Sequence, residues 1–298
     1  MVLPNFLVIG APKSGTTSLY KYLEEHPQVY MSSHKEPRFF AFEGCTGFNG
    51  HGVSRYNIVT NLDEYQRLFS QVADEQAIGE ASTWYLSSPT APERIKHYIP
   101  DVKLIAILRE PAERAYSHYW HLYRKDLEPL DSFEKAIFAE EQRKQSNWLP
   151  DWYYLQEGYY YEHLTRYFQL FSREQIRVYL YEDLCSDPSN VLRDIFQFLE
   201  IDSEFEPNVV QRYNVTKLMR SKRLGDFLNR PSTIKRFIRR TLPQTSRAQA
   251  KQMLMAMNTY DRPKMLPEIK ASLLADYRES IYKLQELLNR DLSHWLAV

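Results

Sequence analysis

The stretch Phe6-Leu7-Val8-Ile9-Gly10-Ala11-Pro12-Lys13-Ser14-Gly15-Thr16-Thr17-Ser18 stands close to the beginning of the 298-residue chain. Its first five residues form a short apolar run that ends in glycine, which is typical of a buried strand. A helical pattern follows at once, with Leu19, Tyr22 and Leu23 at helical spacing. A loop between a strand and a helix binds anions, because its backbone N–H groups point into a concavity and the helix N-terminus is positively polarised. The stretch therefore predicts an anion site at a strand–helix junction.

The position of the lysine in this loop decides which anion is expected. A loop that binds nucleoside triphosphates reads GxxxxGK[ST], with lysine directly after the last glycine and a Ser or Thr that holds magnesium. Here Lys13 stands two residues before Gly15, and Thr16 follows that glycine. The loop is therefore P-loop-like but departs from the pattern of a kinase or NTPase. The alternative to an anion site is a solvent-exposed turn capped by its Ser and Thr residues.

The rest of the chain repeats the alternation of strand and helix. Further strands are expected at 77–81, 102–108 and 176–181. Alternating strands and helices form a parallel sheet that is covered on both faces. We therefore predict an α/β fold, a P-loop-like central parallel sheet of about four to five strands flanked by helices on both faces, with residues 1–298 as a single domain. Residues 123–161 are expected to form helices and loops at the edge of the sheet, and residues 204–265 are irregular.

The bulk composition excludes several classes of protein. Lys+Arg and Asp+Glu both number 38, so the net charge is zero, which argues against a nucleic-acid partner but leaves room for a local basic pocket. The two cysteines, Cys45 and Cys185, indicate neither a disulfide framework nor a metal site, and a reducing cytoplasm is the simplest location. The apolar run at 6–9 is too short for a signal peptide, and no stretch approaches the roughly 18 apolar residues of a membrane span. The composition predicts no particular oligomeric state.

Motifs spread over nearly the whole chain resemble those of PAPS-dependent sulfotransferases, most closely the branch of the heparan sulfate sulfotransferases and their bacterial relatives. The segment Lys13-Ser14-Gly15-Thr16-Thr17-Ser18 resembles the loop that binds the 5′-phosphosulfate of PAPS (3′-phosphoadenosine-5′-phosphosulfate). The other matching motifs are His26-Pro27, Lys35-Glu36-Pro37-Arg38-Phe39-Phe40, Leu108-Arg109-Glu110-Pro111 through Ser117, Gly158-Tyr159, Tyr181-Glu182-Asp183-Leu184 and Arg290-Asp291-Leu292-Ser293-His294-Trp295. The resemblance implies sulfuryl transfer from PAPS to an acceptor hydroxyl, with release of PAP (adenosine 3′,5′-bisphosphate) and without a metal.

The 3′-phosphate distinguishes PAPS from ATP, and a specific site needs a cation for it. Arg109 lies at the carboxyl end of a predicted strand, where open parallel sheets bind ligands, and its guanidinium suits a phosphate. The resemblance assigns Arg109 and Ser117 to the 3′-phosphate; the alternatives are a strand-end salt bridge and an ordinary helix-surface hydroxyl. More loosely, Lys217, Arg220 and Ser221 resemble the loop that closes over the nucleotide, and a solvated basic loop is the alternative.

Catalysis requires a base that takes the proton of the attacking hydroxyl. The resemblance points to Glu36, and the neighbouring Phe39 and Phe40 are expected to raise the pKa of its carboxyl. Lys13 is expected to stabilise the charge that develops on the leaving oxygen. The alternative for Glu36 is a surface carboxylate paired with Lys35 or Arg38. The fallback bases are His34 and His51, and His118 and His121 receive no role.

One departure from the family pattern concerns the acceptor. The glycosaminoglycan enzymes usually read Glu-Lys-(Ser/Thr)-Pro where this chain has Glu80-Ala81-Ser82-Thr83-Trp84, so Ala81 replaces a lysine that helps to hold an acidic sugar chain. We therefore expect a neutral carbohydrate, a glycolipid or a natural-product alcohol, bound by Lys35 and Trp84. Trp148, Trp152 and the tyrosines of 153–161 either line this site or pack in the core. Two other functions are weighed against sulfuryl transfer: a P-loop kinase or NTPase, and a non-catalytic nucleotide-binding protein.

Overall fold

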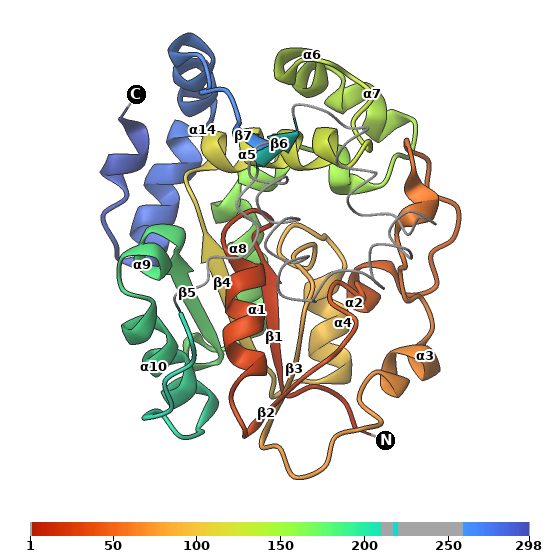
Figure 1. The fold of residues 1–298 in the computed structure, drawn as a ribbon, viewed down its shortest axis with the longest axis vertical. Helices are drawn as coiled ribbons and strands as arrows, with labels where there is room; N and C mark the ends of the chain where they lie inside the picture. The colour runs from red at the N-terminus through yellow and green to blue at the C-terminus, as the bar shows by residue number, and fades with distance from the viewer. Residues whose placement is uncertain (1, 210–216, 220–258, 298) are drawn as a thin grey trace, which may run out of the picture.

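The computed structural model of this chain describes residues 2–209, 217–219 and 259–297 (Figure 1). Its centre is a five-stranded sheet in the order β2-β3-β1-β4-β5, and every pair of neighbouring strands is parallel. The strands are β1 (Phe6–Gly10), β2 (Val29–Met31), β3 (Ala77–Ala81), β4 (Lys103–Leu108) and β5 (Ile176–Leu180). The predicted parallel sheet is confirmed. In this sheet, sequence reasoning missed β2, whose three residues at the sheet edge are too few to show a period.

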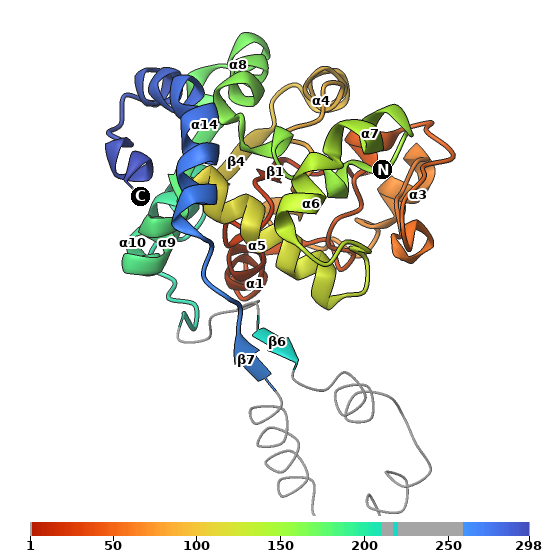
Figure 2. The same ribbon diagram turned by 90° about the horizontal axis from the view of Figure 1, so that it is seen from above.

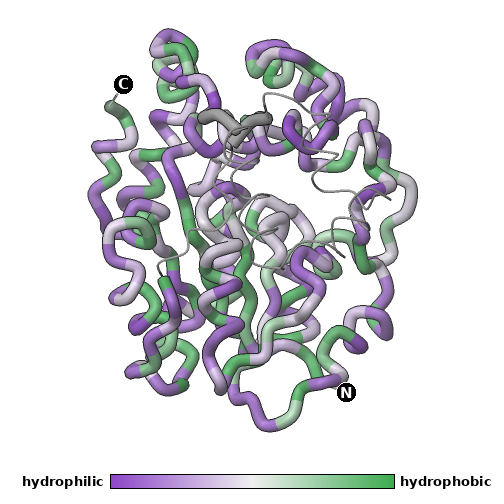
Figure 3. The backbone as a smooth tube through the Cα atoms, viewed as in Figure 1, coloured by the Kyte–Doolittle hydropathy of each residue, from purple (hydrophilic) through white to green (hydrophobic). Residues whose placement is uncertain are grey.

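The sheet is covered on both faces because successive residues of its central strands point to opposite sides. Phe6 and Val8 of β1 are fully buried in one core, and Leu7 and Ile9 are fully buried in another. The first core is closed by α1 (Thr16–Glu24) and α10 (Pro188–Leu199). The second is closed by α4 (Ala91–Tyr98), α5 (Pro111–Arg124), α8 (Tyr160–Leu170) and α14 (Pro267–Leu288). Figure 2 shows α4 and α8 on one side of β1 and β4 and α1 on the other, and Figure 3 shows apolar residues gathered along the central strands.

The segment 123–161 forms helices and loops, as expected, and adds to the second core. Its helices are α6 (Phe133–Phe138), α7 (Glu140–Gln145), and the 3-10 turns η2 (Pro150–Trp152) and η3 (Gln156–Gly158). Arg143 and Glu128 form a buried ion pair within the segment, with nitrogen–oxygen distances of 2.7 and 3.0 Å. Trp152 is fully buried, and its indole N–H donates to the carbonyl of Leu127 at 2.9 Å. Trp152 is therefore a core residue.

The remaining elements are short. They are α2 (Phe39–Phe42), α3 (Leu62–Arg67), α9 (Tyr181–Ser186), the 3-10 turns η1 (Val53–Arg55), η4 (Arg173–Gln175) and η5 (Ser293–Leu296), and an antiparallel pair β6 (Lys217–Met219) and β7 (Thr259–Asp261). This pair lies within the stretch 204–265 that reads as irregular. In the described part of the chain, no helix has the length and apolar character needed to cross a bilayer. That residues 1–298 form one domain stays a prediction.

Candidate active site

A cavity of about 770 Å³ opens at the carboxyl ends of β1, β3 and β4. This volume is in the range of small-molecule and cofactor sites, and the position is the usual one for an open parallel sheet. Its wall combines the loop after β1, the start of α1, the segment after β3 and one face of α5. Among the described residues, the charged side chains of the wall are Lys13, Lys35, Glu36, Arg38, Arg109, Lys125, Asp151 and Arg262.

The loop after β1 turns sharply into α1. Lys13 and Gly15 both have left-handed backbones, with φ of 69° and 91°. A Cβ at Gly15 would lie 3.0 Å from Leu184, so glycine fits here both for its backbone and for its missing side chain. α1 then begins at Thr16, and the first turn of a helix has N–H groups without partners inside the helix. These groups and the helix dipole make the loop suitable for an anion.

The side chains of this loop divide into two groups. The cavity is lined by Lys13, Thr16, Thr17 and Ser18, as the anion site requires. Ser14 is fully buried and is absent from the cavity wall, and its N–H donates to the carbonyl of Ala11 at 3.3 Å. Ser14 therefore belongs to the turn, its buried hydroxyl has no hydrogen-bond partner among the described residues, and its part in donor binding stays a prediction.

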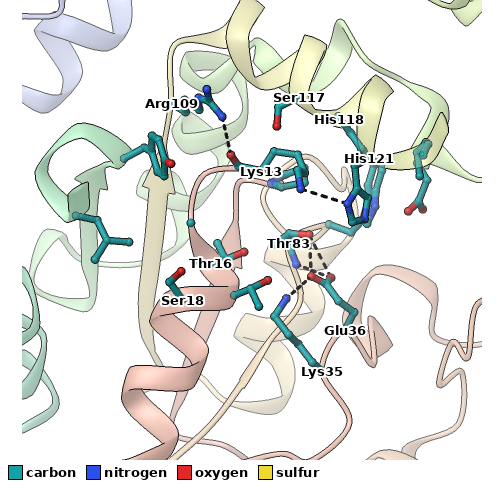
Figure 4. A pocket seen from close by; sticks show the side chains of 18 of the residues that line it. Lys13, Thr16, Ser18, Lys35, Glu36, Thr83, Arg109, Ser117, His118 and His121 are labelled. Atoms are coloured by element: carbon teal, nitrogen blue, oxygen red, sulfur yellow. Dashed lines mark hydrogen bonds and ion pairs between the residues drawn. The ribbon is translucent and has the colours of Figure 1, made fainter. Parts of the chain in front are cut away.

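Lys13 extends into the cavity toward α5. Its Nζ lies 3.3 Å from Nδ1 of His121 (Figure 4). Burial lowers the pKa of Lys13 to about 7, and the nearby cations Arg124, Lys125 and Arg109 act in the same direction. Burial and Lys13 also lower the pKa of His121, so a neutral imidazole lies beside Lys13 and supplies no compensating negative charge. A cation that is poorly compensated in this way is prepared to receive an anion.

Arg109 lies on the other side of the loop. Its guanidinium donates to the carbonyl of Lys13 at 3.4 Å, pairs with Glu113 at 3.3 Å and lies 4.9 Å from the ring centre of Tyr181. The strand-end salt bridge that sequence analysis named as the alternative is thus present. It does not remove Arg109 from the cavity, whose wall also includes Ser117 from α5. The structure therefore brings the two predicted 3′-phosphate residues to one wall.

Glu36 lies opposite Lys13 and is held from three sides. Its carboxylate accepts from the backbone N–H of Thr83 at 2.9 Å and from the Thr83 hydroxyl at 3.1 Å. Lys35 Nζ lies 3.0 Å from one oxygen and Arg38 Nε lies 3.8 Å from the other. The backbone of Glu36 is left-handed, with φ of 66°, and its N–H donates to the carbonyl of Ala81 at 3.0 Å. The pairing that sequence analysis named as the alternative is present with both Lys35 and Arg38, but the carboxylate lines the cavity.

The pKa of Glu36 departs from the sequence-based expectation. Burial raises this pKa, but the charges of Lys35 and Arg38 outweigh burial, so the net direction is downward. Phe39 and Phe40 are fully buried and pack on Tyr65, with ring centres of Phe39 and Tyr65 4.6 Å apart. The expectation that these two rings raise the pKa is therefore wrong, because neighbouring cations dominate the environment of the carboxylate.

Only some of the residues predicted to bind the acceptor or to act as a fallback base line the cavity. Lys35 and Trp84 line the cavity, although Trp84 is only 4% exposed. Trp148 packs edge-on against the buried Trp152, with ring centres 5.2 Å apart. His34 and His51 are absent from the wall formed by the described residues. The loop predicted to close over the nucleotide cannot be compared in the same way. Arg220 and Ser221 fall outside the described residues, as does the side chain of Lys217.

Comparison with known proteins identifies the family. A model with the description "Sulfotransferase family" matches residues 4–207, which is more than half of the chain. The chain belongs to the sulfotransferase family. This confirms the resemblance found in the motifs and supports the prediction of a transferase.

Several relatives of this sulfotransferase are known. It is 28% identical to the membrane-associated sulfotransferase kil1 of Dictyostelium discoideum over 310 aligned positions, which cover 76% of this chain and 63% of that protein. It is 31% identical to the bifunctional heparan sulfate N-deacetylase/N-sulfotransferase 4 of Mus musculus, over 68% of this chain and 23% of that one. The chain thus spans less than two thirds of the length of these curated relatives. The crystal structure of a sulfotransferase from Alicyclobacillus acidocaldarius matches the whole of both chains with a TM-score of 0.78 and 31% identity.

The structure of this sulfotransferase also adds residues that sequence reasoning missed. Thr83 supplies two of the contacts to Glu36, and His121 contacts Lys13. Arg262 shares the carboxylate of Glu113 with Arg109, at 2.6 Å, and lines the cavity. For His121 a signal existed, since it follows Ser117 by four residues and so lies on the same face of α5. Arg262 carried no such signal, because it comes from a stretch without periodicity.

Proposed function

We propose that this sulfotransferase moves the sulfuryl group of PAPS to an acceptor hydroxyl and releases PAP. The observation that carries the proposal is that three features line one cavity. These are an anion loop with Lys13, a second cationic subsite with Arg109, and the carboxylate of Glu36. A kinase or NTPase would need the lysine after the glycine and a magnesium ligand set, and the loop lacks the first of these.

The wall of the cavity offers contacts for the 5′-phosphosulfate, the 3′-phosphate and the adenine ring of the donor. Lys13, Thr16, Thr17 and Ser18 would hold the 5′-phosphosulfate at the start of α1, and Arg109 and Ser117 would hold the 3′-phosphate. Tyr22, Leu184 and Val209 also line the cavity and offer an apolar surface for the adenine ring. Arg109 and Arg262 both pair with the single carboxylate of Glu113, so this carboxylate neutralises only one of their two positive charges.

The reaction follows from these positions. The acceptor oxygen attacks sulfur in line, a new O–S bond forms, and the bond between sulfur and the oxygen of the 5′-phosphate breaks. Glu36 accepts the proton of the acceptor hydroxyl as general base. The ammonium of Lys13 stabilises the negative charge on the leaving 5′-phosphate oxygen. No step requires a metal, and the absence of a metal requirement stays a prediction.

The proposed acceptor is a carbohydrate, a glycolipid or a natural-product alcohol. Lys35 and Trp84 lie on the wall beside Glu36 and are the proposed acceptor contacts. Ala81, on which the expectation of a neutral acceptor rests, is fully buried, and its carbonyl holds the backbone of Glu36. A cytoplasmic location is likewise a proposal, consistent with Cys45 and Cys185, which are not joined in a disulfide.

Calorimetric titration with PAP, AMP and ATP tests the donor. We expect PAP to bind about 10- to 100-fold more tightly than AMP, because charge-assisted hydrogen bonds to the 3′-phosphate contribute roughly 1.5–3 kcal/mol. Arg109→Met should remove most of this preference and leave AMP binding within about threefold. Tight binding of ATP without any preference for PAP would overturn the proposal.

Donor binding should also take up a proton. Burial and neighbouring cations hold the pKa of Lys13 at about 7 in the free protein, and a bound 5′-phosphate should raise it. Above pH 7 the free lysine loses its proton while the bound lysine keeps it, so PAP affinity should fall by up to about tenfold per pH unit between pH 7 and 9. The phosphate groups themselves titrate near pH 6, below this window.

Calorimetry in buffers of different ionisation enthalpy measures this uptake directly. Lys13→Met should bind PAP more weakly and lose the pH dependence in the same window. An affinity of the wild-type protein that stays constant from pH 7 to 9, with no proton uptake, would show that Lys13 does not contact the donor.

A further inference from the structure

A buried ion pair joins the loop of Glu36 to the segment 123–161. Arg38 and Asp151 are 6% and 4% exposed and are 113 residues apart in sequence. Their bond is bidentate, with Nη1–Oδ2 and Nη2–Oδ1 distances of 2.7 and 3.1 Å. The guanidinium also lies 4.9 Å from the ring centre of Tyr56. Two oxygens and a ring therefore fix the plane of Arg38, and both partners line the cavity.

The third guanidinium nitrogen of Arg38, Nε, lies near Glu36. Arg38 Nε lies 3.8 Å from Glu36 Oε2, which is beyond hydrogen-bond distance, and it has no hydrogen-bond partner among the described residues. The backbone N–H of Arg38 donates to Ser82 at 2.9 Å, next to the Thr83 that binds Glu36. Arg38 thus supplies a positive charge close to the carboxylate without closing a direct bond to it.

Asp151 explains why this contact stays open. A free guanidinium near a carboxylate closes into a bidentate pair, and such a pair would occupy the oxygen that has to receive the proton of the acceptor. Here Asp151 accepts one hydrogen bond from each Nη atom and so fixes the guanidinium in a position where its Nε lies 3.8 Å from Glu36, outside hydrogen-bond distance. The competing carboxylate keeps Arg38 at a distance that stabilises the charge of Glu36 without blocking it.

We propose that Asp151 is a positioning residue of the active site, which acts by holding Arg38 beside the catalytic carboxylate of Glu36. This inference rests on the proposed role of Glu36 as general base. It gives the segment 123–161 a part in catalysis, in addition to its part in the core. The other titratable groups near Glu36 are Lys35 on its own loop, Tyr56, Lys125 after α5, Glu80 on β3, and His34.

The proposal predicts opposite effects of two substitutions on Glu36. In Arg38→Gln the buried carboxylate loses a cation and keeps the negative Asp151 nearby, so the pKa of Glu36 should rise by at least one unit. In Asp151→Asn the negative charge is removed and Arg38 is free to bond Glu36 directly, so the pKa of Glu36 should fall. A purely structural pair would loosen the site in both variants and move the pKa in the same direction.

Carbon-13 NMR of glutamate carboxyl groups measures this pKa, with the Glu36 signal assigned from its loss in Glu36→Gln. The measurement needs neither donor nor acceptor. The proposal about Asp151 can therefore be overturned while sulfuryl transfer is confirmed, or supported while sulfuryl transfer is disproved. Glu128→Gln is the matched control, because it breaks another buried arginine–carboxylate pair of the same segment, and this pair lies outside the cavity wall. It should leave the pKa of Glu36 unchanged.

A conservative variant covers the possibility that Arg38→Gln does not fold. Arg38→Lys keeps a positive charge near Glu36 and should leave its pKa below the ordinary value, with folding checked by thermal denaturation. An unchanged Glu36 pKa in Asp151→Asn, or shifts of the same sign in Asp151→Asn and Arg38→Gln, would overturn the proposal. In Arg38→Lys, a rise as large as that in Arg38→Gln would do the same.

Discussion

Replacement of Lys13 by alanine is expected to lower the rate of sulfuryl transfer by about 10²- to 10³-fold, the usual loss when one electrostatic contact to a developing oxyanion is removed. The ammonium lies between the anion loop and His121, and α5 offers no second lysine at that point of the wall. The effect should fall mainly on kcat, because the charge on the leaving oxygen is greatest in the transition state. The rate of PAP formation from PAPS, with phenols and simple sugars as probe acceptors, measures it.

Lys21→Ala is the matched control for this prediction. Lys21 belongs to the helix that follows the loop, but it is exposed and pairs with Glu24 at 2.5 Å, outside the cavity wall. Its removal should leave the rate within about twofold. A rate for Lys13→Ala within about threefold of the wild type would mean that the leaving oxygen is stabilised by backbone N–H groups alone.

The sequence predicted those parts of the site that are continuous in the chain. The loop 10–18 carries its own strand, turn and helix start, so its anion site follows from local structure. Arg109 is similar, because the end of a strongly apolar strand places it at the edge where ligands bind. The parallel sheet was also predictable, because runs such as β4 are long and apolar.

The contacts that tune the site arise where distant segments meet. Thr83 and Asp151 approach Glu36 and Arg38 across 47 and 113 residues of sequence. No hydrophobic period or motif spacing in the sequence indicates these contacts, so sequence reasoning missed the roles of Thr83 and Asp151. It also assigned the wrong direction to the pKa of Glu36, here because it gave the apolar neighbours Phe39 and Phe40 more weight than the charges of Lys35 and Arg38, which stand beside Glu36 in the sequence. The aromatic neighbours in sequence pack in the core, and the cations next to the carboxylate determine its charge.

The net charge of the whole chain does not indicate the charge of the cavity. The total is zero. In the described part of the chain, however, six cationic side chains line the cavity, namely Lys13, Lys35, Arg38, Arg109, Lys125 and Arg262, against the two carboxylates Glu36 and Asp151. The excess is local, and a donor with several negative charges would neutralise it. A balanced composition is therefore compatible with a strongly cationic site.

Replacement of Glu36 by glutamine is expected to leave PAP binding within about threefold and to lower kcat by about 10²- to 10⁴-fold, which is the usual contribution of a general base. Glutamine has nearly the same shape, and its amide oxygen can still accept from Thr83 at the position where the carboxylate does so now. It cannot take a proton from the acceptor. The separation of binding from turnover therefore distinguishes a base from a residue that merely shapes the donor site. Calorimetry with PAP and steady-state rates with the same probe acceptors measure the two quantities.

Glu43→Gln is the control for this substitution. Glu43 follows α2, pairs with Arg94 at 3.5 Å and lies outside the cavity wall, so its loss should leave turnover unchanged. Full turnover in Glu36→Gln would transfer the role of base to another group of the cavity. The next candidate would then be His118, because burial and the nearby Arg114 lower its pKa and keep its imidazole neutral. In that case the activity of His118→Ala should be lost instead, and the cations beside Glu36 would serve to bind the acceptor.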